Sequence, residues 1–512
     1  MTSKPAPSAT PHLSRARDGL RALSGVALTV AAICALPMIA VLIAALSGVT
    51  ETVQHLIDTV LGRYTVTTLL LVLLVSAGTF SIGVGAAWLV TMTRFPGAKV
   101  LEIALVLPLA FPAYVLAYAY THVLDHPGVV QATLRDVTGW GPRDYWFPEI
   151  RSLGGAAAML VLVLYPYVYL LARAAFLQQS GTTFLAARAL GSSAWAAFFK
   201  VSLPLARPAI AGGVLLAVME TIADFGTVAY FGVQTFATGI YTSWFSLFDR
   251  AAAAQLALCL LSFALLLAML ERAQRGKAKY HDPSRRTQSA PPSELKGVQA
   301  AAAIVLCGVP VLFGAVLPVV ILVTMGMESE QNLFSPRYLG FMRNSVTLAG
   351  VAAVLTVLAA ISVGFFRRLR PGRLSQGAAY VARLGYAVPG GVIAVGLLVP
   401  FAAFDNALDA WMRATFDIST GLLITGSIWL LVLAYLVRFL AAALGAYEGG
   451  QAMVHANMDA AARSLGQTPL GTLRRVHLPI LAPSLLTALL IVFVDVMKEL
   501  PATLIMRPFN YD

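Results

Sequence analysis

The stretch AAARSLGQTPLGTLRRVHLPILAPSL, residues 460–485, has a near copy earlier in the chain, LAARALGSSAWAAFFKVSLPLARPAI at residues 185–210. The two copies share Ala-Ala-Arg, Leu-Gly, Val-x-Leu-Pro and a further Pro, and every shared position is offset by 275 residues, as from Ala186 to Ala461. Each copy precedes a long apolar segment. The repeat therefore predicts two homologous halves, each with the same polar loop before a membrane segment.

The composition indicates a polytopic membrane protein. Of the 512 residues, 58% are hydrophobic and 12% charged, which is too little charge for a soluble protein of this size. The unbroken apolar runs exclude barrel strands, which alternate in short segments. Basic residues in cytoplasmic loops explain the formal charge of +12 without a nucleic-acid partner. The predicted fold class is an all-α polytopic membrane protein with two homologous halves of about six transmembrane helices each.

The apolar runs also predict how the chain is divided. Residues 1–22 are expected to form a cytoplasmic leader, 23–271 the first half, 272–298 a charged cytoplasmic linker and 299–512 the second half. The counterpart of the last span of the first half is missing, so either the chain is truncated or this member lacks its last helix. The predicted spans are about 25–46, 67–92, 101–123, 155–176, 209–231, 251–270, 300–325, 344–366, 378–403, 421–444 and 483–506.

The repeated loop has a physical interpretation. Ala-Ala-Arg-x-Leu-Gly predicts a short helix that is closed by a glycine, Gly191 or Gly466, which tolerates a positive φ. Pro204 and Pro479 are expected to end the next helical stretch where a span begins. The alanines offer a smooth face to a groove on a partner. A single copy would also suit an ordinary interfacial helix, but two copies in register before the fifth span of each half favour paired docking.

These residues resemble the EAA loops of the fused membrane subunits of binding-protein-dependent ABC importers. The resemblance implies the type I importer permease fold and two coupling helices that dock onto ATPase subunits. The acidic residue of the motif is absent, because Leu185 and Ala460 occupy its position, and Asp459 lies one residue earlier. The implied coupling residues are Ala186, Ala187, Arg188, Gly191, Pro204, Ala461, Ala462, Arg463, Gly466 and Pro479.

The same resemblance implies partners and a location. We expect ABC ATPase subunits, as a homodimer that holds ATP and magnesium, and a periplasmic substrate-binding protein. The expected location is the bacterial inner membrane, with the N-terminus and the Arg-rich loops in the cytoplasm by the positive-inside rule. The chain has no Gly-x4-Gly-Lys-Ser/Thr phosphate loop, so it is expected to bind no cofactor and not to be an enzyme.

Three stretches resemble the ferric-iron branch of this family: LPLAFPAYVLAYAY (107–120), ADFGTVAYFGVQTFATGIYTSWF (223–245) and FVDVMKELPATLIMRPFNYD (493–512). The resemblance therefore implies ferric iron as the substrate. Thiamine and polyamine importers share the scaffold and are the alternatives.

Four carboxylates lie inside predicted spans: Glu220 with Asp224, and Asp495 with Glu499 at the same positions of the repeat. Spacing of i, i+4 places each pair on one helix face. Such acids are costly unless they face water or the bundle interior, and oxygen ligands suit a hard cation. We therefore consider them candidates for the translocation path. The alternative is that they satisfy Lys498 or the backbone and hold helices together. The scattered histidines predict no metal site.

A proton- or ion-coupled secondary transporter is the alternative function. Such carriers also favour duplicated halves and use intramembrane carboxylates as proton relays. The paired loops count against this alternative, because an ion-driven carrier needs no ATPase-docking device.

Overall fold

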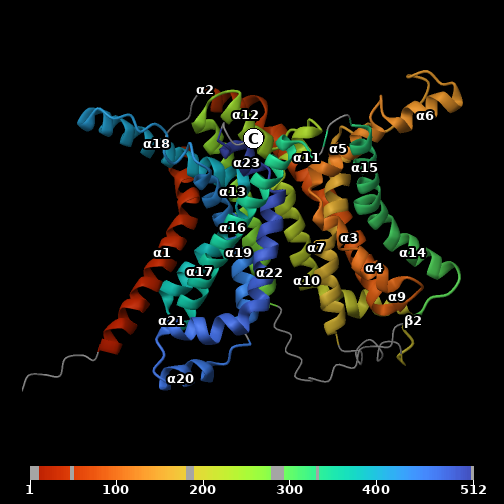
Figure 1. The fold of residues 1–512 in the computed structure, drawn as a ribbon. Coiled ribbons are helices and arrows are strands. Elements are labelled where there is room, and N and C mark those ends of the chain that lie inside the picture. Colours follow the sequence, from red (N-terminus) through yellow and green to blue (C-terminus); the bar gives the residue numbers. More distant parts are fainter. Residues whose placement is uncertain are drawn as a thin grey trace, which may run out of the picture. The chain divides into compact units, whose positions relative to one another are not determined.

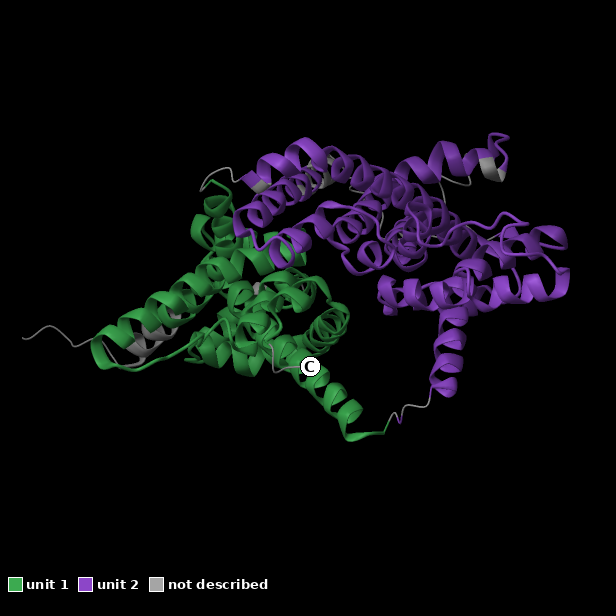
Figure 2. Ribbon diagram, turned by 90° about the horizontal axis from the view of Figure 1, so that it is seen from above, with its two compact units in different colours: residues 1–48, 333–512 green, residues 49–332 purple. Residues whose placement is uncertain are grey.

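The computed structural model describes residues 11–46, 51–179, 189–277, 293–329, 332, 334–451 and 453–508, and these residues are almost entirely helical (Figure 1). Ten of the described helices are long and apolar enough to cross a membrane, or eleven if one bent pair counts as a span. The chain forms two compact units, residues 49–332 and residues 1–48 with 333–512 (Figure 2). The all-α membrane fold predicted from the sequence is confirmed.

The unit of residues 49–332, unit 2 in Figure 2, contains eighteen described elements. They are α2 (Glu51–Thr59), α3 (Leu61–Met92), β1 (Thr93–Arg94), α4 (Ala98–Ala104), η1 (Leu107–Ala110), α5 (Ala113–Leu124), α6 (Val129–Thr138), α7 (Leu153–Gln178), α9 (Ala194–Ala197), η2 (Phe198–Ser202), α10 (Leu203–Ala223), α11 (Gly226–Tyr230), α12 (Phe236–Phe245), α13 (Arg250–Lys277), β2 (Ser293–Glu294), α14 (Val298–Val311), η3 (Leu312–Val316) and α15 (Leu317–Glu328). The two short strands β1 and β2 pair in parallel.

The other unit, residues 1–48 with 333–512 and unit 1 in Figure 2, repeats much of this order. Its elements are α1 (Pro11–Ala45), α16 (Pro336–Leu369), α17 (Arg373–Leu384), η4 (Gly385–Ala387), α18 (Gly390–Phe416), α19 (Ile428–Gln451), α20 (Ala456–Ser464), α21 (Pro469–Thr472), η5 (Leu473–His477), α22 (Leu478–Lys498) and α23 (Pro501–Met506). The bounds of α10 and α22, and those of η2 and η5, differ by the same 275 residues as the sequence copies. The sequence repeat is therefore also a structural repeat.

The two Leu-Pro sequences do not end a helix, contrary to our expectation. Helical structure runs without a break from Ala194 to Ala223, and from Pro469 to Lys498. A π-helical turn, η2 or η5, comes directly before each Leu-Pro. Proline lacks an N–H and crowds the carbonyl four residues back, and the wider turn accommodates both defects.

The predicted spans 101–123 and 378–403 are each broken near their middle. The span expected at 101–123 consists of α4, η1 and α5, and the chain bends by 93° between residues 98–110 and 113–138. The span expected at 378–403 is divided in the same way into α17, η4 and α18. Pro108 and Pro112 lie at the first break and Pro389 at the second. Each proline removes a backbone donor and restricts the residue before it, so helix cannot continue.

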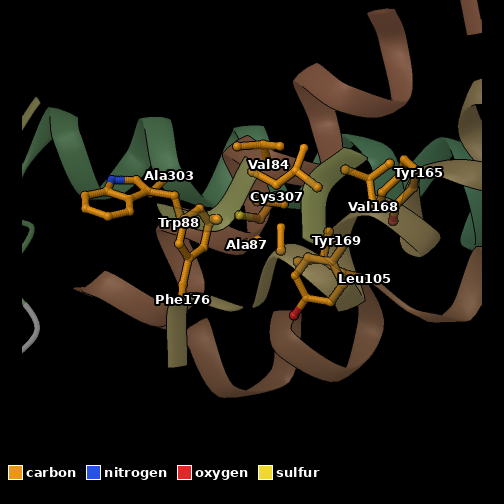
Figure 3. Close-up of a cluster of buried hydrophobic side chains, with 14 of the residues drawn as sticks. Val84, Ala87, Trp88, Leu105, Tyr165, Val168, Tyr169, Phe176, Ala303 and Cys307 are labelled. Carbon is orange, nitrogen blue, oxygen red and sulfur yellow. The ribbon is translucent and has the colours of Figure 1, made fainter. Parts of the chain in front are cut away.

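The compact units are not the sequence halves 23–271 and 299–512, because the first helix of each half packs with the opposite half. Helix α1 contacts α16, α17, α18 and α21, whereas α14, η3 and α15 contact α3, α4, α5 and α7. Figure 3 shows Ala303 and Cys307 of α14 among the buried side chains of the 49–332 unit, beside Val84 and Trp88 of α3. In the other unit, a side chain at Gly396 would collide with the backbone of Pro37.

One position of the repeat carries an inter-helix ion pair in both units, but with opposite charge. In the 49–332 unit, Arg173 of α7 pairs with Glu102 of α4. In the other unit, Glu448 of α19 occupies the position of Arg173 and pairs with Arg383 of α17, and its second oxygen lies 2.8 Å from Arg367 Nη1. Residues of opposite charge at one position of the repeat thus each form an ion pair with a short helix of their own unit.

Candidate functional site

The second repeated loop, residues 453–477, is a short helix followed by a tight glycine turn. Helix α20 begins after His455, whose Nδ1 accepts a hydrogen bond from the backbone N–H of Asn457 (3.2 Å). The helix closes at Gly466, whose φ is +74° and whose N–H donates to the carbonyl of Arg463 (3.0 Å). Gly191 has a φ of +86° at the same place in the first repeated loop. Both glycines therefore adopt the left-handed backbone that the motif predicts.

The predicted coupling residues differ in exposure. Ala186, Ala187 and Arg188 lie outside the described residues. Ala461 and Arg463 are exposed on α20, whereas Ala462 is buried against the rest of its unit. Pro479 is exposed and Pro204 half-buried, each in the first turn of its helix.

Three large apolar side chains of the same loop are also exposed. Leu465 is 79% exposed, Leu470 68% and Met458 40%. Clustered exposed apolar side chains rimmed by polar groups are typical of interaction surfaces. The loop therefore offers Ala461 and three larger apolar side chains to a partner.

A buried cluster of charged and polar groups anchors α20 to its unit. Asp459 Oδ2 accepts from Arg368 Nε of α16 (2.7 Å), and Asp459 Oδ1 lies 2.6 Å from His477 Nε2 of η5. Arg368 also donates to the carbonyl of Val454 (2.8 Å). His477 is fully buried, with its ring 5.0 Å from that of Phe365. Asp459 thus links the loop helix to the end of α16 and to the turn that leads into α22.

The environment of Asp459 also sets its protonation. Burial alone would raise the pKa of this carboxyl, but hydrogen bonds from His477 and Arg368 and the Arg368 charge outweigh burial and hold the pKa below its ordinary value. Sequence reasoning identified Asp459 only as a displaced acid of the motif, because neither partner is close to it in the sequence. The corresponding residues of the first half are Phe184, Thr93 and Ser202, so this cluster belongs to one half only.

A hollow of about 550 Å³ adjoins the second loop. Gln467, Thr468, Leu470, Gly471, Arg474 and Arg475 line it. Both arginines are exposed, and neither forms an ion pair with another described residue. Phe199 and Lys200 stand at the corresponding positions of the first loop. The second loop therefore carries more positive charge than the first.

Two of the four membrane acids cap a helix break. Asp224 ends α10 and accepts from the N–H groups of Thr227 and Val228 (both 3.1 Å) and from Thr227 Oγ1 (3.0 Å). Glu499 ends α22 and accepts from Ala502 N–H (2.9 Å), Thr503 N–H (3.1 Å) and Thr503 Oγ1 (2.9 Å). A carboxylate that satisfies the first N–H groups of a helix is an N-terminal cap. These contacts support the alternative in which the acids satisfy the backbone.

The acids of the second half also have cationic neighbours. Glu499 Oε1 lies 3.8 Å from Arg438 Nη1, with both side chains nearly buried, and Asp495 Oδ1 lies 3.2 Å from Lys498 Nζ. Asp224 has no ion pair with any described residue. The half-buried Glu220 lies one turn before Asp224 and acts on it as a like charge. Among the described residues, Asp224 therefore has no counterpart of the cationic neighbour that Glu499 has in Arg438.

A resident metal site finds no support in the described part of the chain. There, no group of three or more His, Cys, Asp or Glu side chains could hold a metal ion. Glu220 and Asp495 lie on α10 and α22, whereas Asp224 and Glu499 are the extended residues that end these helices, so the predicted i, i+4 pairs are not contained in one helix. A cation could meet them in passing, as a substrate, but the described residues build no closed cage.

Replacing Asp459 by Asn should loosen α20 locally, because it removes a carboxylate that two partners share. We expect hydrogen exchange of the α20 amides at neutral pH to accelerate by tenfold or more, the effect of losing about 1–3 kcal/mol. Asp417→Asn, at an exposed position with φ of +56°, is a matched control, because Asn tolerates this conformation.

The pH dependence gives a second readout. Because the pKa of Asp459 is lowered on folding, its contribution is complete above the unfolded pKa, about 3.9, and is lost as the pH falls toward the folded pKa. In wild-type protein, protection of α20 should therefore fall in acid, and this loss should be absent in Asp459→Asn. Equal protection of both proteins at neutral pH would show that Asp459 does not anchor the helix.

Comparison with known proteins identifies relatives over most of the chain. The sequence model of the family described as "Binding-protein-dependent transport system inner membrane component" matches residues 79–277. The Fe(3+)-transport system permease protein FbpB 2 of Haemophilus influenzae is 26% identical over 468 residues, which cover 90% of this chain and 84% of the relative. The ferric transport system permease protein FbpB of Actinobacillus pleuropneumoniae is 24% identical over 78% of this chain and 58% of its own length.

A shorter relative matches little more than a third of the chain. The molybdenum transport system permease protein ModB of Escherichia coli is 30% identical over 197 residues, which make up 37% of this chain and 81% of ModB. A relative of this length agrees with a chain in which one permease unit occurs twice. The chain belongs to the family of binding-protein-dependent transport system inner membrane components.

Proposed function

We propose that this permease forms the translocation path of an ATP-driven importer, and that separate ATPase subunits dock on its two repeated loops. The observation that carries the proposal is the recurrence of one loop design at one place in both repeats. Each loop closes with a positive-φ glycine and leads through a π-helical turn into the helix that bears the membrane acids. The family membership supports the same reading, with a periplasmic binding protein as the second partner.

The second loop has the contacts needed to transmit a movement. The exposed face of α20 offers Ala461 to a partner, while Asp459 on the same helix is tied to Arg368 of α16 and His477 of η5. Since η5 continues into α22, a displacement of α20 would be passed to a membrane helix without an intervening flexible segment. Coupling of this kind requires two global states that the nucleotide-bound and nucleotide-free ATPase favour differently.

We propose ferric iron as the transported substrate. Relatives named as ferric transport permeases match 90% and 78% of the chain. Ferric iron is a hard cation that prefers oxygen ligands. The first half places Glu220 in a candidate membrane helix and Asp224, which has no ion pair with a described residue, at the end of that helix. The acids of the second half, being close to Lys498 and Arg438, would attract a cation less.

Blocking the face of α20 tests the docking proposal. Ala461→Trp adds bulk where the partner should fit closely, so the amount of ATPase that co-purifies with the permease should fall at least tenfold while the permease level stays normal. Ala414→Trp adds the same bulk at an exposed alanine near the C-terminal end of α18 and should leave co-purification unchanged. Full ATPase recovery with Ala461→Trp would refute docking at this loop.

Neutralising the acids tests the path. Asp224→Asn retains an oxygen that can cap α11, so combined with Glu220→Gln it removes charge with little loss of structure. We expect uptake of labelled ferric iron to fall at least tenfold at normal protein level. Asp495→Asn, whose charge is already balanced by Lys498, should reduce uptake less than threefold. Unchanged uptake in the Glu220 and Asp224 double variant would remove these acids from the path.

A further inference from the structure

A groove of about 550 Å³ lies between α3, α10 and α13 within the 49–332 unit. All three helices are candidate membrane spans. On α10 the lining residues extend from Leu203 to Val218, a distance of about 22 Å along the helix. This exceeds the roughly 15 Å depth of the hydrocarbon in one leaflet. The groove is therefore long enough to hold an acyl chain over the full depth of a leaflet.

The groove is apolar except at two positions. Ser76 and Arg207 are the polar residues of its lining, and side chains such as Phe80, Val214 and Leu267 form the rest. Arg207 lies on the second turn of α10, at the end next to the first repeated loop. The positive-inside rule places this end of α10 at the cytoplasmic face of the membrane.

Arg207 carries a charge that the described residues do not balance. Its side chain is exposed, and it forms no hydrogen bond or ion pair with any of them. A guanidinium stays ionised at every accessible pH and is costly beside hydrocarbon unless an anion accompanies it. Its planar donors match phosphate oxygens in a bidentate way.

The internal repeat indicates that the fold does not require this arginine. Ala482 takes the place of Arg207 in α22, and Val351 takes the place of Ser76 in α16. Both α10 and α22 nevertheless have the same length and the same preceding π-helical turn. The cation in the groove is thus a feature added to one half only.

We propose that this groove binds one phospholipid with an anionic headgroup. Its phosphate would pair with Arg207, and an acyl chain would lie along α10 toward Val218. The cation at one end of the groove matches the phosphate of such a lipid, and the long apolar remainder of the groove matches its acyl chain. The proposal is independent of the transported substrate and of ATPase docking.

Native mass spectrometry of the purified full-length chain in mild detergent, with added phosphatidylglycerol or phosphatidylethanolamine, tests the proposal. Wild-type protein should retain phosphatidylglycerol preferentially. Arg207→Ala should bind it about tenfold more weakly, the usual effect of losing a charge-assisted hydrogen bond, and Arg207→Lys should retain part of the preference. Lys99→Ala removes an exposed cation of α4 that does not line the groove and should change nothing.

A second variant tests whether the lipid needs the apolar groove itself, with the Arg207 charge left in place. Ala211→Trp should fill it and abolish retention of the lipid, whereas Leu205→Trp, on the same helix but outside the lining, should not. Glycerophosphoglycerol, the headgroup without acyl chains, should not displace the lipid. Equal phosphatidylglycerol binding by wild type and Arg207→Ala would overturn the proposal, and so would the absence of retained lipid in wild type. If Ala211→Trp failed to fold, the comparison of Arg207→Ala with Arg207→Lys would still decide.

Discussion

Each place where a membrane helix breaks in this chain leaves backbone N–H groups that hydrocarbon cannot satisfy. The chain meets this constraint with a few local devices that recur in both repeats. Prolines lie at the N-terminal boundary of the helix that follows a break, as at Pro112 before α5 and Pro389 before α18. The carboxylates of Asp224 and Glu499 accept from the first N–H groups of the short helices that follow the breaks. Carboxylates therefore stand inside the membrane segments because the backbone requires acceptors there.

The two halves share this backbone structure but differ in their charged side chains. Arg173 and Glu448 occupy one position with opposite sign, and each finds a partner on the preceding short helix. Glu499 lies near Arg438, whereas its counterpart Asp224 has no ion pair with a described residue. The Asp459 cluster and Arg474 with Arg475 occur in the second half only, and Arg207 in the first. The duplicated scaffold therefore presents different charges in its two halves.

The sequence predicted the parts of the fold that depend on local pattern. The length of the apolar runs predicted the spans, and the constant 275-residue offset predicted the repeat. Gly191 and Gly466 predicted where the short loop helices end. Helix partners were beyond prediction, because apolar faces such as those of α1 and α14 suit either half, and the exchange of first helices leaves no local signal. The breaks near Pro108 and Pro389 had a signal in the prolines that apolar length concealed.

The candidate site was predicted to a similar degree. The loops and the four acids were visible in the sequence, but the partners of Asp459 lie 91 and 18 residues away, at Arg368 and His477. Capping by Asp224 and Glu499 could have been suspected from the threonines that follow, Thr227 and Thr503. Because each loop is followed by a Leu-Pro sequence, the end of a helix was the simpler expectation there. The π-helical turns that let the helix continue have no comparably clear sequence signal.

We propose that ATP hydrolysis by docked ATPase subunits drives the transport of substrate through this permease. The most direct test is uptake of labelled ferric iron into proteoliposomes that contain the permease with its ATPase and binding protein, with ATP or a proton gradient as the energy source. Thiamine and polyamine serve as competitors. We expect iron uptake that requires ATP, is independent of the proton gradient and is not reduced by either competitor. Uptake that continues without ATP and collapses with the proton gradient would contradict it.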